Sequence, residues 1–134
     1  MKPQYHATSS VLIAGILYLI FKSWSMALSC LISGILIDID HGYDYIKRYG
    51  FPLKKKDIYN ALYNNDMTRW TIVLHSWELL FLIFIIAWIT NWNLWITGVL
   101  IGFGHHILMD AFYNEVTILN YSFVWRWKNN FIVK

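Results

Sequence analysis

Long apolar stretches separated by short polar breaks dominate this chain. Four stand out, with bounds near residues 7–21, 24–39, 70–90 and 94–112. A helix that crosses a bilayer needs about 20 apolar residues, and only the last two stretches reach that length. The first two are shorter and carry Ser and Gly, which let membrane helices approach one another closely. The pattern predicts an all-α integral membrane bundle of about four helices, in which the first two either cross fully or form a tilted hairpin.

One substantial polar stretch interrupts this pattern, between the second and third apolar segments, from Gly42 to Arg69. Within it, Lys54–Asp66 begins with three lysines and places Ile58 and Leu62 on one side of a helix. That pattern is typical of an amphipathic helix lying along lipid headgroups. A solvated connecting helix is the alternative.

The C-terminal segment alternates aromatic and basic residues, which predicts an anchor at the membrane interface. The alternating residues are Tyr121, Phe123, Trp125, Arg126, Trp127 and Lys128.

Composition supports a membrane protein. Hydrophobic residues make up 57% of the 134 residues and charged residues 14%, against roughly 25% charged in soluble domains. A short soluble chain has too much surface to bury that much apolar side chain, so the excess is expected to face lipid. We expect a single membrane-embedded domain over residues 1–134. The lone cysteine, Cys30, excludes both a disulfide within the chain and a cysteine zinc site.

The basic residues give the expected orientation. If four segments alternate in direction, the N-terminus, residues 42–69 and the C-terminus share one side of the membrane. Of the 11 Lys and Arg residues, all but Lys22 fall on that side. The positive-inside rule places it in the cytoplasm, so we expect a multi-pass protein of the cell (inner) membrane. Because this asymmetry accounts for the net charge of +3, nucleic acid is not expected as a partner.

Acidic residues and histidines follow the same partition. They stand before the first segment, at the end of the second, at the start of the third and toward the end of the fourth. Ionisable side chains in membrane segments are costly and are normally paired or functional. We therefore expect a site at the cytoplasmic end of the bundle. Its candidates are His6, Asp38, Asp40, His41, His75, Glu78, His105, His106 and Asp110.

The spacing of these residues favours a metal site. Three His–carboxylate pairs have helical spacing, namely Asp38 with His41, His75 with Glu78, and His106 with Asp110. Bundles build metal sites from such pairs on facing helices. Imidazole with carboxylate favours zinc, with manganese and iron as alternatives, and there is room for one or two divalent ions. His105 and His106 lie about 100° apart on a helix, so only one is expected to point inward.

The chain contains His6, Ile-Asp-Ile-Asp-His at 37–41, Leu-His-Ser at 74–76 and Gly-x-x-x-His-Ile-Leu-x-Asp at 102–110, in that order. This order resembles the YdjM-like family of membrane-bound, metal-dependent hydrolases, small inner-membrane proteins that look distantly similar to zinc-dependent phospholipase C. That fold is an all-helical metal cage that cleaves phosphoesters. The resemblance covers the chain from residue 6 to about 125, and its most specific parts are 38–41 and 106–110.

The resemblance implies a set of metal ligands, and it favours His106 over His105 because the family has a small residue before this histidine. The implied ligands are His6, Asp38, Asp40, His41, His75, His106 and Asp110. The chain departs from the family where Trp70 replaces a histidine, Leu74 a threonine and Ile37 a proline. Glu78 is the candidate to replace the missing ligand.

We therefore expect a hydrolase that acts on an ester or phosphoester bond of a membrane lipid, because only a lipid reaches a site at that depth by lateral diffusion. Asp38 or Asp40, whichever is not fully engaged, is the candidate general base, and Glu78 is a further catalytic candidate. Lys54–Lys56 and Arg69 would attract anionic headgroups. A homo-oligomer is compatible with these expectations.

Two other functions remain open. A carrier of metal ions or protons would need polar residues through the outer half of the bundle, where the third and fourth segments offer only Thr90 and Thr97. A structural or assembly subunit would use the same cluster only to join the helices.

Overall fold

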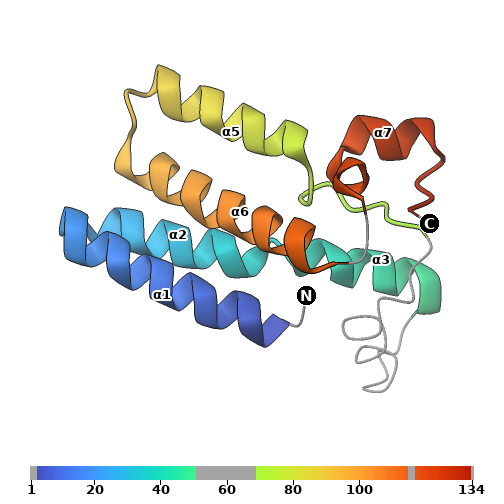
Figure 1. Cartoon of the computed structure of the whole chain (residues 1–134), viewed down its shortest axis with the longest axis horizontal. Coiled ribbons are helices and arrows are strands. Elements are labelled where there is room, and N and C mark those ends of the chain that lie inside the picture. Colours follow the sequence, from blue (N-terminus) through green and yellow to red (C-terminus); the bar gives the residue numbers. More distant parts are fainter. Residues whose placement is uncertain (1–2, 51–68, 115–116, 134) are drawn as a thin grey trace.

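The computed structural model describes residues 3–50, 69–114 and 117–133, and its regular elements there are all helices (Figure 1). They are α1 (Pro3–Phe21), α2 (Trp24–Leu36), α3 (Ile39–Tyr49), α5 (Trp77–Ile89), α6 (Leu94–Tyr113), the short 3-10 helix η1 (Ile118–Tyr121) and α7 (Phe123–Lys128). The predicted all-α bundle is confirmed. The amphipathic helix expected at Lys54–Asp66 lies outside the described residues.

Within the described residues, three helical stretches are long and apolar enough to cross a membrane: Gln4–Phe21, Trp24–Lys47 and Leu94–Tyr113. This differs from the expectation that the third apolar segment spans fully, because α5 begins only at Trp77 and has 13 residues. A helix of that length covers about 20 Å, less than the roughly 30 Å of a bilayer core. The apolar spans indicate a membrane protein.

The long helices lie side by side in one layer, with α6 beside α2 and α2 beside α1, while α5 lies over α6 (Figure 1). The α1–α2 and α5–α6 turns are at one end of the bundle. At the other end lie the start of α1, the α2–α3 junction, the start of α5 and the end of α6. The described histidines and aspartates gather at this second end.

Two glycines allow α6 to approach the backbone of α2. A Cβ atom at Gly98 would lie 2.3 Å from the carbonyl oxygen of Met26, and one at Gly102 would lie 2.2 Å from that of Cys30. Gly98 and Gly102 are one turn apart, and His106 follows a further turn along the same face. The close packing of small residues predicted for the bundle therefore also brings His106 against α2.

The C-terminal segment is not simply an interfacial anchor, and this expectation is wrong for two of its residues. Tyr121 and Arg126 are completely buried, whereas Trp127 is 67% exposed. Tyr121 belongs to the main hydrophobic cluster, which also contains Ile37, Trp70, Ile72, Phe103, Ile107 and Val133. The segment folds back over residues 70–76 because its apolar side chains complete this core.

Candidate metal centre

A break between α2 and α3 delivers the first acidic residue to the site. The sequence predicts a second apolar segment that runs to residue 39. In the structure α2 ends earlier, at Leu36, and α3 begins at Ile39. Asp38 occupies the N-cap position of α3 without a capping hydrogen bond from its side chain. An N-cap aspartate normally accepts a backbone N–H. Here the carboxylate instead faces histidines.

Four side chains bring one potential ligand atom each to a common point. Asp38 Oδ1 lies 3.5 Å from His75 Nε2 and 3.3 Å from His106 Nε2. Asp110 Oδ2 lies 3.5 Å from His75 Nε2 and 3.6 Å from His106 Nε2. Within this group of four, all ligand atoms fall within 4.8 Å of one another. The donors come from the α2–α3 junction, the segment before α5, and two positions on α6, so only tertiary folding assembles them.

The two histidines direct bare nitrogen atoms at this point. His75 Nε2 and His106 Nε2 are buried, and neither has a hydrogen-bond partner among the described residues. The opposite nitrogen of each ring is fixed: His106 Nδ1 donates to the Gly34 carbonyl at 2.8 Å, and His75 Nδ1 donates to Asp40 Oδ1 at 3.0 Å. Because these acceptors require a proton on Nδ1, each Nε2 presents a lone pair. Metal-ligating histidines are held in this way.

The chemistry of the donor set fits a divalent cation. Two imidazole nitrogens and two carboxylate oxygens match the ligands of zinc, and of manganese or iron. Bringing two buried carboxylates together is costly unless a cation or protonated histidine offsets their repulsion. The cluster could therefore hold a metal ion. The donor set does not determine which metal it would be.

His6 borders these four residues and orients one of them. Its Nε2 donates to Asp110 Oδ1 at 3.0 Å. Its ring stacks on that of His106, with centroids 3.8 Å apart and an interplanar angle of 11°. His6 on α1 thus fixes the Asp110 carboxylate through Oδ1, while Oδ2 of the same carboxylate faces His75 and His106.

Asp40 and His41 extend the cluster on its other side. Asp40, His41 and His75 form a second group whose potential ligand atoms lie within 4.8 Å of one another. Asp40 also accepts the backbone N–H of Leu74 at 2.8 Å. With His75 as its other partner, Asp40 is positioned to orient that ring. All seven ligands implied by the resemblance thus lie in or beside one cluster.

Glu78 does not join this cluster, which corrects the expectation that it pairs with His75 and supplies a ligand or catalytic group. Because α5 starts at Trp77, His75 precedes the helix and the two side chains do not share a helical face. The Glu78 carboxylate instead accepts hydrogen bonds from the Ser122 hydroxyl and from the backbone N–H groups of Phe123 (2.9 Å) and Val124 (3.2 Å). It secures the start of α7.

Trp70, which replaces a histidine of the family pattern, also has a structural role. Its side chain is 3% exposed. Its ring makes edge contacts with Tyr121 and His41, with centroids 5.8 and 6.2 Å away. The replacement thus substitutes apolar packing for a potential ligand.

Sequence analysis missed two residues that hold the segment carrying His75. The buried Arg126 guanidinium donates to the carbonyl oxygens of Ile72 at 2.7 Å and His75 at 2.9 Å. Asp44 accepts the backbone N–H of Thr71 at 2.8 Å as well as its hydroxyl. Asp44 lies one turn after Asp40, so helical spacing offered a signal for it. Arg126, in an aromatic and basic tail, offered none.

The electrostatics of His75 follow from this setting. Burial acts to lower its pKa, but the neighbouring carboxylates of Asp38 and Asp40 outweigh burial, and the pKa of His75 lies above its ordinary value. Without a cation, His75 is therefore more readily protonated than a free imidazole.

His105 faces away from the cluster. Its Nδ1 contacts the Gly102 carbonyl at 3.0 Å and its Nε2 lies 3.0 Å from the Ser9 hydroxyl on α1. The structure thus places His106, the histidine favoured by the resemblance, at the metal centre and its neighbour outside it.

Comparisons of the chain with protein-family models, curated proteins and solved structures find no match. Fold and site alone therefore define its class. It is an all-helical bundle with membrane-type spans and a buried His/Asp cluster that could hold a metal ion.

Proposed function

We propose that this chain is a metal-dependent hydrolase of the membrane that cleaves a phosphoester or ester bond of a lipid, and that it is a member of the YdjM-like family. One observation carries the proposal: the lone pairs of His75 Nε2 and His106 Nε2, buried without partners, face two carboxylate oxygens. Buried polar atoms normally find a partner, and those that lack one call for an explanation such as an ion.

Asp38, His75, His106 and Asp110 would hold the ion. When bound, a divalent cation supplies Lewis-acid chemistry, which lowers the pKa of water and neutralises charge on a phosphoester. His6 and Asp40 would keep Asp110 and His75 in their orientations through the contacts described above.

Asp38 is the better candidate for the general base, with Oδ1, the atom that faces the histidines, as its ligand atom and Oδ2 as the proton acceptor. Its side chain is 25% exposed, whereas those of His75, His106 and Asp110 are 1%, 0% and 4% exposed. A water molecule can therefore approach Asp38 from the open side of the cluster. Asp40 is engaged by both Leu74 and His75, so it is better suited to positioning than to accepting a proton.

The depth of the cluster supports a lipid substrate. It lies toward the end of the Leu94–Tyr113 span and beside the start of the Gln4–Phe21 span, where a bilayer lipid arrives by lateral diffusion. The excess of basic residues on the same side favours the cytoplasmic leaflet of the cell membrane. Zinc is the favoured ion, with manganese and iron as alternatives.

Hydrolysis by the purified protein tests the proposal. The detergent-solubilised chain, supplied in turn with zinc and manganese, is assayed for headgroup release from phospholipids and for phosphate release from an isoprenyl phosphate. An Asp38→Asn variant should reduce turnover by roughly 10²–10⁴-fold, the range for loss of a general base. Lys128→Ala, at an exposed position of α7 outside the cluster and the groove, should retain activity. A wild-type protein that binds metal but hydrolyses none of these lipids would contradict the proposal.

A second candidate function, that of a structural subunit, is favoured by the presence of Trp70 in place of a histidine. The ligands come from several elements, so a bound ion could serve only to join them. In that case chelation would lower the unfolding temperature and hydrolysis would not be observed under any of the conditions above.

A further inference from the structure

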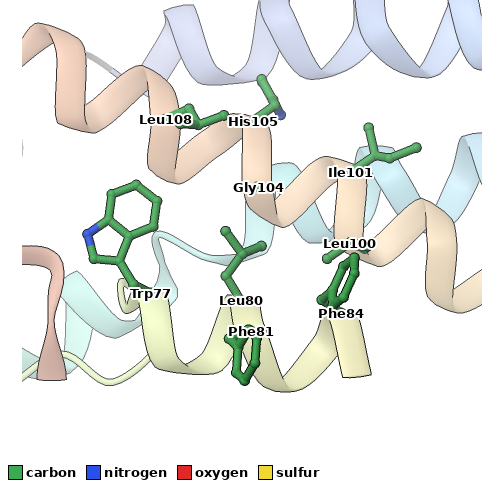
Figure 2. Close-up of a pocket in the computed structure, with 9 residues that line it drawn as sticks. All are labelled: Trp77, Leu80, Phe81, Phe84, Leu100, Ile101, Gly104, His105 and Leu108. Atoms are coloured by element: carbon green, nitrogen blue, oxygen red, sulfur yellow. The ribbon is translucent and has the colours of Figure 1, made fainter. Parts of the chain in front are cut away.

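A groove with almost wholly apolar walls lies between α5 and α6 (Figure 2). Its volume is about 650 Å³, within the range of about 300–1,000 Å³ typical of ligand sites. Its lining residues are Trp77, Leu80, Phe81, Phe84, Leu100, Ile101, Gly104, His105 and Leu108.

The groove begins at the end of the bundle that carries the metal centre. On α5, Trp77 comes two residues after His75, and on α6, Leu108 comes two residues before Asp110. From Trp77 the groove extends along α5 to Phe84 (Figure 2). Seven residues of helix correspond to about 10 Å. The groove is therefore elongated and runs from the end of the bundle that carries the metal centre toward its middle.

Its walls favour a hydrocarbon ligand. Among the described residues, no charged side chain lines the groove. Both ring nitrogens of His105 already contact Ser9 and Gly102, and the Trp77 ring N–H donates to the Ile118 carbonyl. A polar ligand would lose its hydration there without gaining partners. The surface beside the groove is also apolar, because α5 exposes large side chains such as Phe81 and Ile89.

A glycine provides part of the space. The nearest atom to a Cβ at Gly104 would be a Leu80 methyl carbon 3.4 Å away. In contrast to Gly98 and Gly102, Gly104 does not pack against the backbone of another helix. The missing side chain leaves room in the groove.

We infer that one acyl chain of a bilayer phospholipid lies in this groove, with the phosphate headgroup of the same lipid toward the metal centre. The inference deepens the proposed function and rests on it for the position of the headgroup. Binding of the chain depends only on the groove and can be measured without turnover.

Photo-crosslinking tests the inference. The full chain is reconstituted in vesicles containing phosphatidylglycerol with a diazirine on one acyl chain, and labelled residues are mapped after illumination. We expect saturable labelling at Leu80, Phe84 and Leu108 that excess unlabelled phosphatidylglycerol reduces. Labelling at Leu19 and Ile20, which are 65% and 66% exposed on α1, should follow only the bulk concentration of the probe.

Two matched substitutions separate the groove from the general lipid surface. Gly104→Leu should lower groove labelling by roughly tenfold, the order of effect of a small misfit in an apolar pocket. Gly15→Leu, at a helical glycine with nothing near its Cβ position, should leave the labelling unchanged. Metal content and unfolding temperature, measured in all three proteins, identify a variant that has failed to fold.

Three outcomes would overturn the inference: groove labelling that does not saturate in the wild type, labelling unchanged by a folded Gly104→Leu variant, or labelling that disappears as the protein-to-lipid ratio rises. The last would assign the groove to a second copy of the chain. Saturable labelling without hydrolysis would support the lipid site while contradicting the proposed enzyme, so the two failures are distinguishable.

Discussion

His106 Nδ1 donates a hydrogen bond to the backbone carbonyl of Gly34, 2.8 Å away, and this contact joins helix packing to the metal centre. Gly34 lies in the last turn of α2, where carbonyl groups lack helical partners. A Cβ at Gly34 would lie 2.5 Å from the Ser10 hydroxyl oxygen and 3.3 Å from His105 Cε1. Tight packing among α1, α2 and α6 therefore sets the orientation of the His106 ring.

Replacing His106 should abolish metal binding. His106→Ala removes a ligand nitrogen, so elemental analysis of the detergent-purified protein should find about one divalent ion per chain in the wild type and almost none in the variant. His105→Ala is the matched control, since it removes the adjacent imidazole and should retain the ion. Equal metal contents in the two variants would show that His106 is not a ligand.

The approach of α6 to α2 should be sensitive to a single methyl group. Gly102→Ala would place Cβ 2.2 Å from the Cys30 carbonyl oxygen, and overpacking of this kind costs about 1–3 kcal/mol. Thermal unfolding should show the loss of stability, and metal affinity should fall because His106 moves from Gly34. Gly15→Ala, which has open space around it, should be neutral or slightly stabilising. A Gly102→Ala protein with unchanged stability would be inconsistent with this helix contact.

Asp40 should contribute to metal affinity through the orientation of His75. Asp40→Asn weakens the acceptor for His75 Nδ1, and loss of such a contact typically reduces metal affinity by about 10–100-fold. Competition with a chromophoric chelator measures the change. An Asp40→Asn protein that binds no metal at all would instead assign Asp40 as a direct ligand, in the second group with His41 and His75.

Arg126 should stabilise the segment that carries His75. Arg126→Ala leaves the carbonyls of Ile72 and His75 without donors, and hydrogen bonds from charged groups contribute about 1.5–3 kcal/mol each. We expect a clearly lower unfolding temperature and weaker metal binding. Lys128→Ala, which changes an exposed basic residue of the same helix, should have little effect on either. If the two variants have the same unfolding temperature and metal affinity, Arg126 does not stabilise this segment.

Metal binding should strengthen as pH rises. Because the pKa of His75 is raised above its ordinary 6.5, its protonation stabilises the metal-free fold below that pH, and this contribution is lost as pH rises through the folded-state pKa. A metal ion must displace this proton from His75, so the stabilisation by the metal increases as pH rises, whereas the stabilisation by the proton decreases. The difference in unfolding temperature between metal-loaded and chelator-treated protein should increase as pH rises from below 6.5, the ordinary pKa of His75, to above it. A constant difference would indicate that no proton is displaced.

Local pattern and composition were sufficient for the class of fold. Apolar length predicts membrane helices because each must cover its backbone in lipid. Of the two segments predicted to be long enough, α6 is and α5 is not, whereas the first two, for which the prediction was open, lie in the spans Gln4–Phe21 and Trp24–Lys47. Placement of the acidic residues and histidines at one end also followed from alternation of the segments. The implied ligand set, from His6 to Asp110, does come together at that end.

Tertiary structure decided the rest, because packing between distant segments overrides local periodicity. Residues 70–76 are apolar enough to continue α5, yet they are held in a non-helical segment by Asp44 and Arg126, which places His75 toward Asp38 and separates it from Glu78. The tail after Asn120 reads as an interfacial anchor, but burial of Tyr121 completes the core. The sequence by itself determined which residues gather at one end of the helices. Only the fold determined which nitrogen and oxygen atoms face one another, because those contacts join residues as far apart as His6 and Asp110.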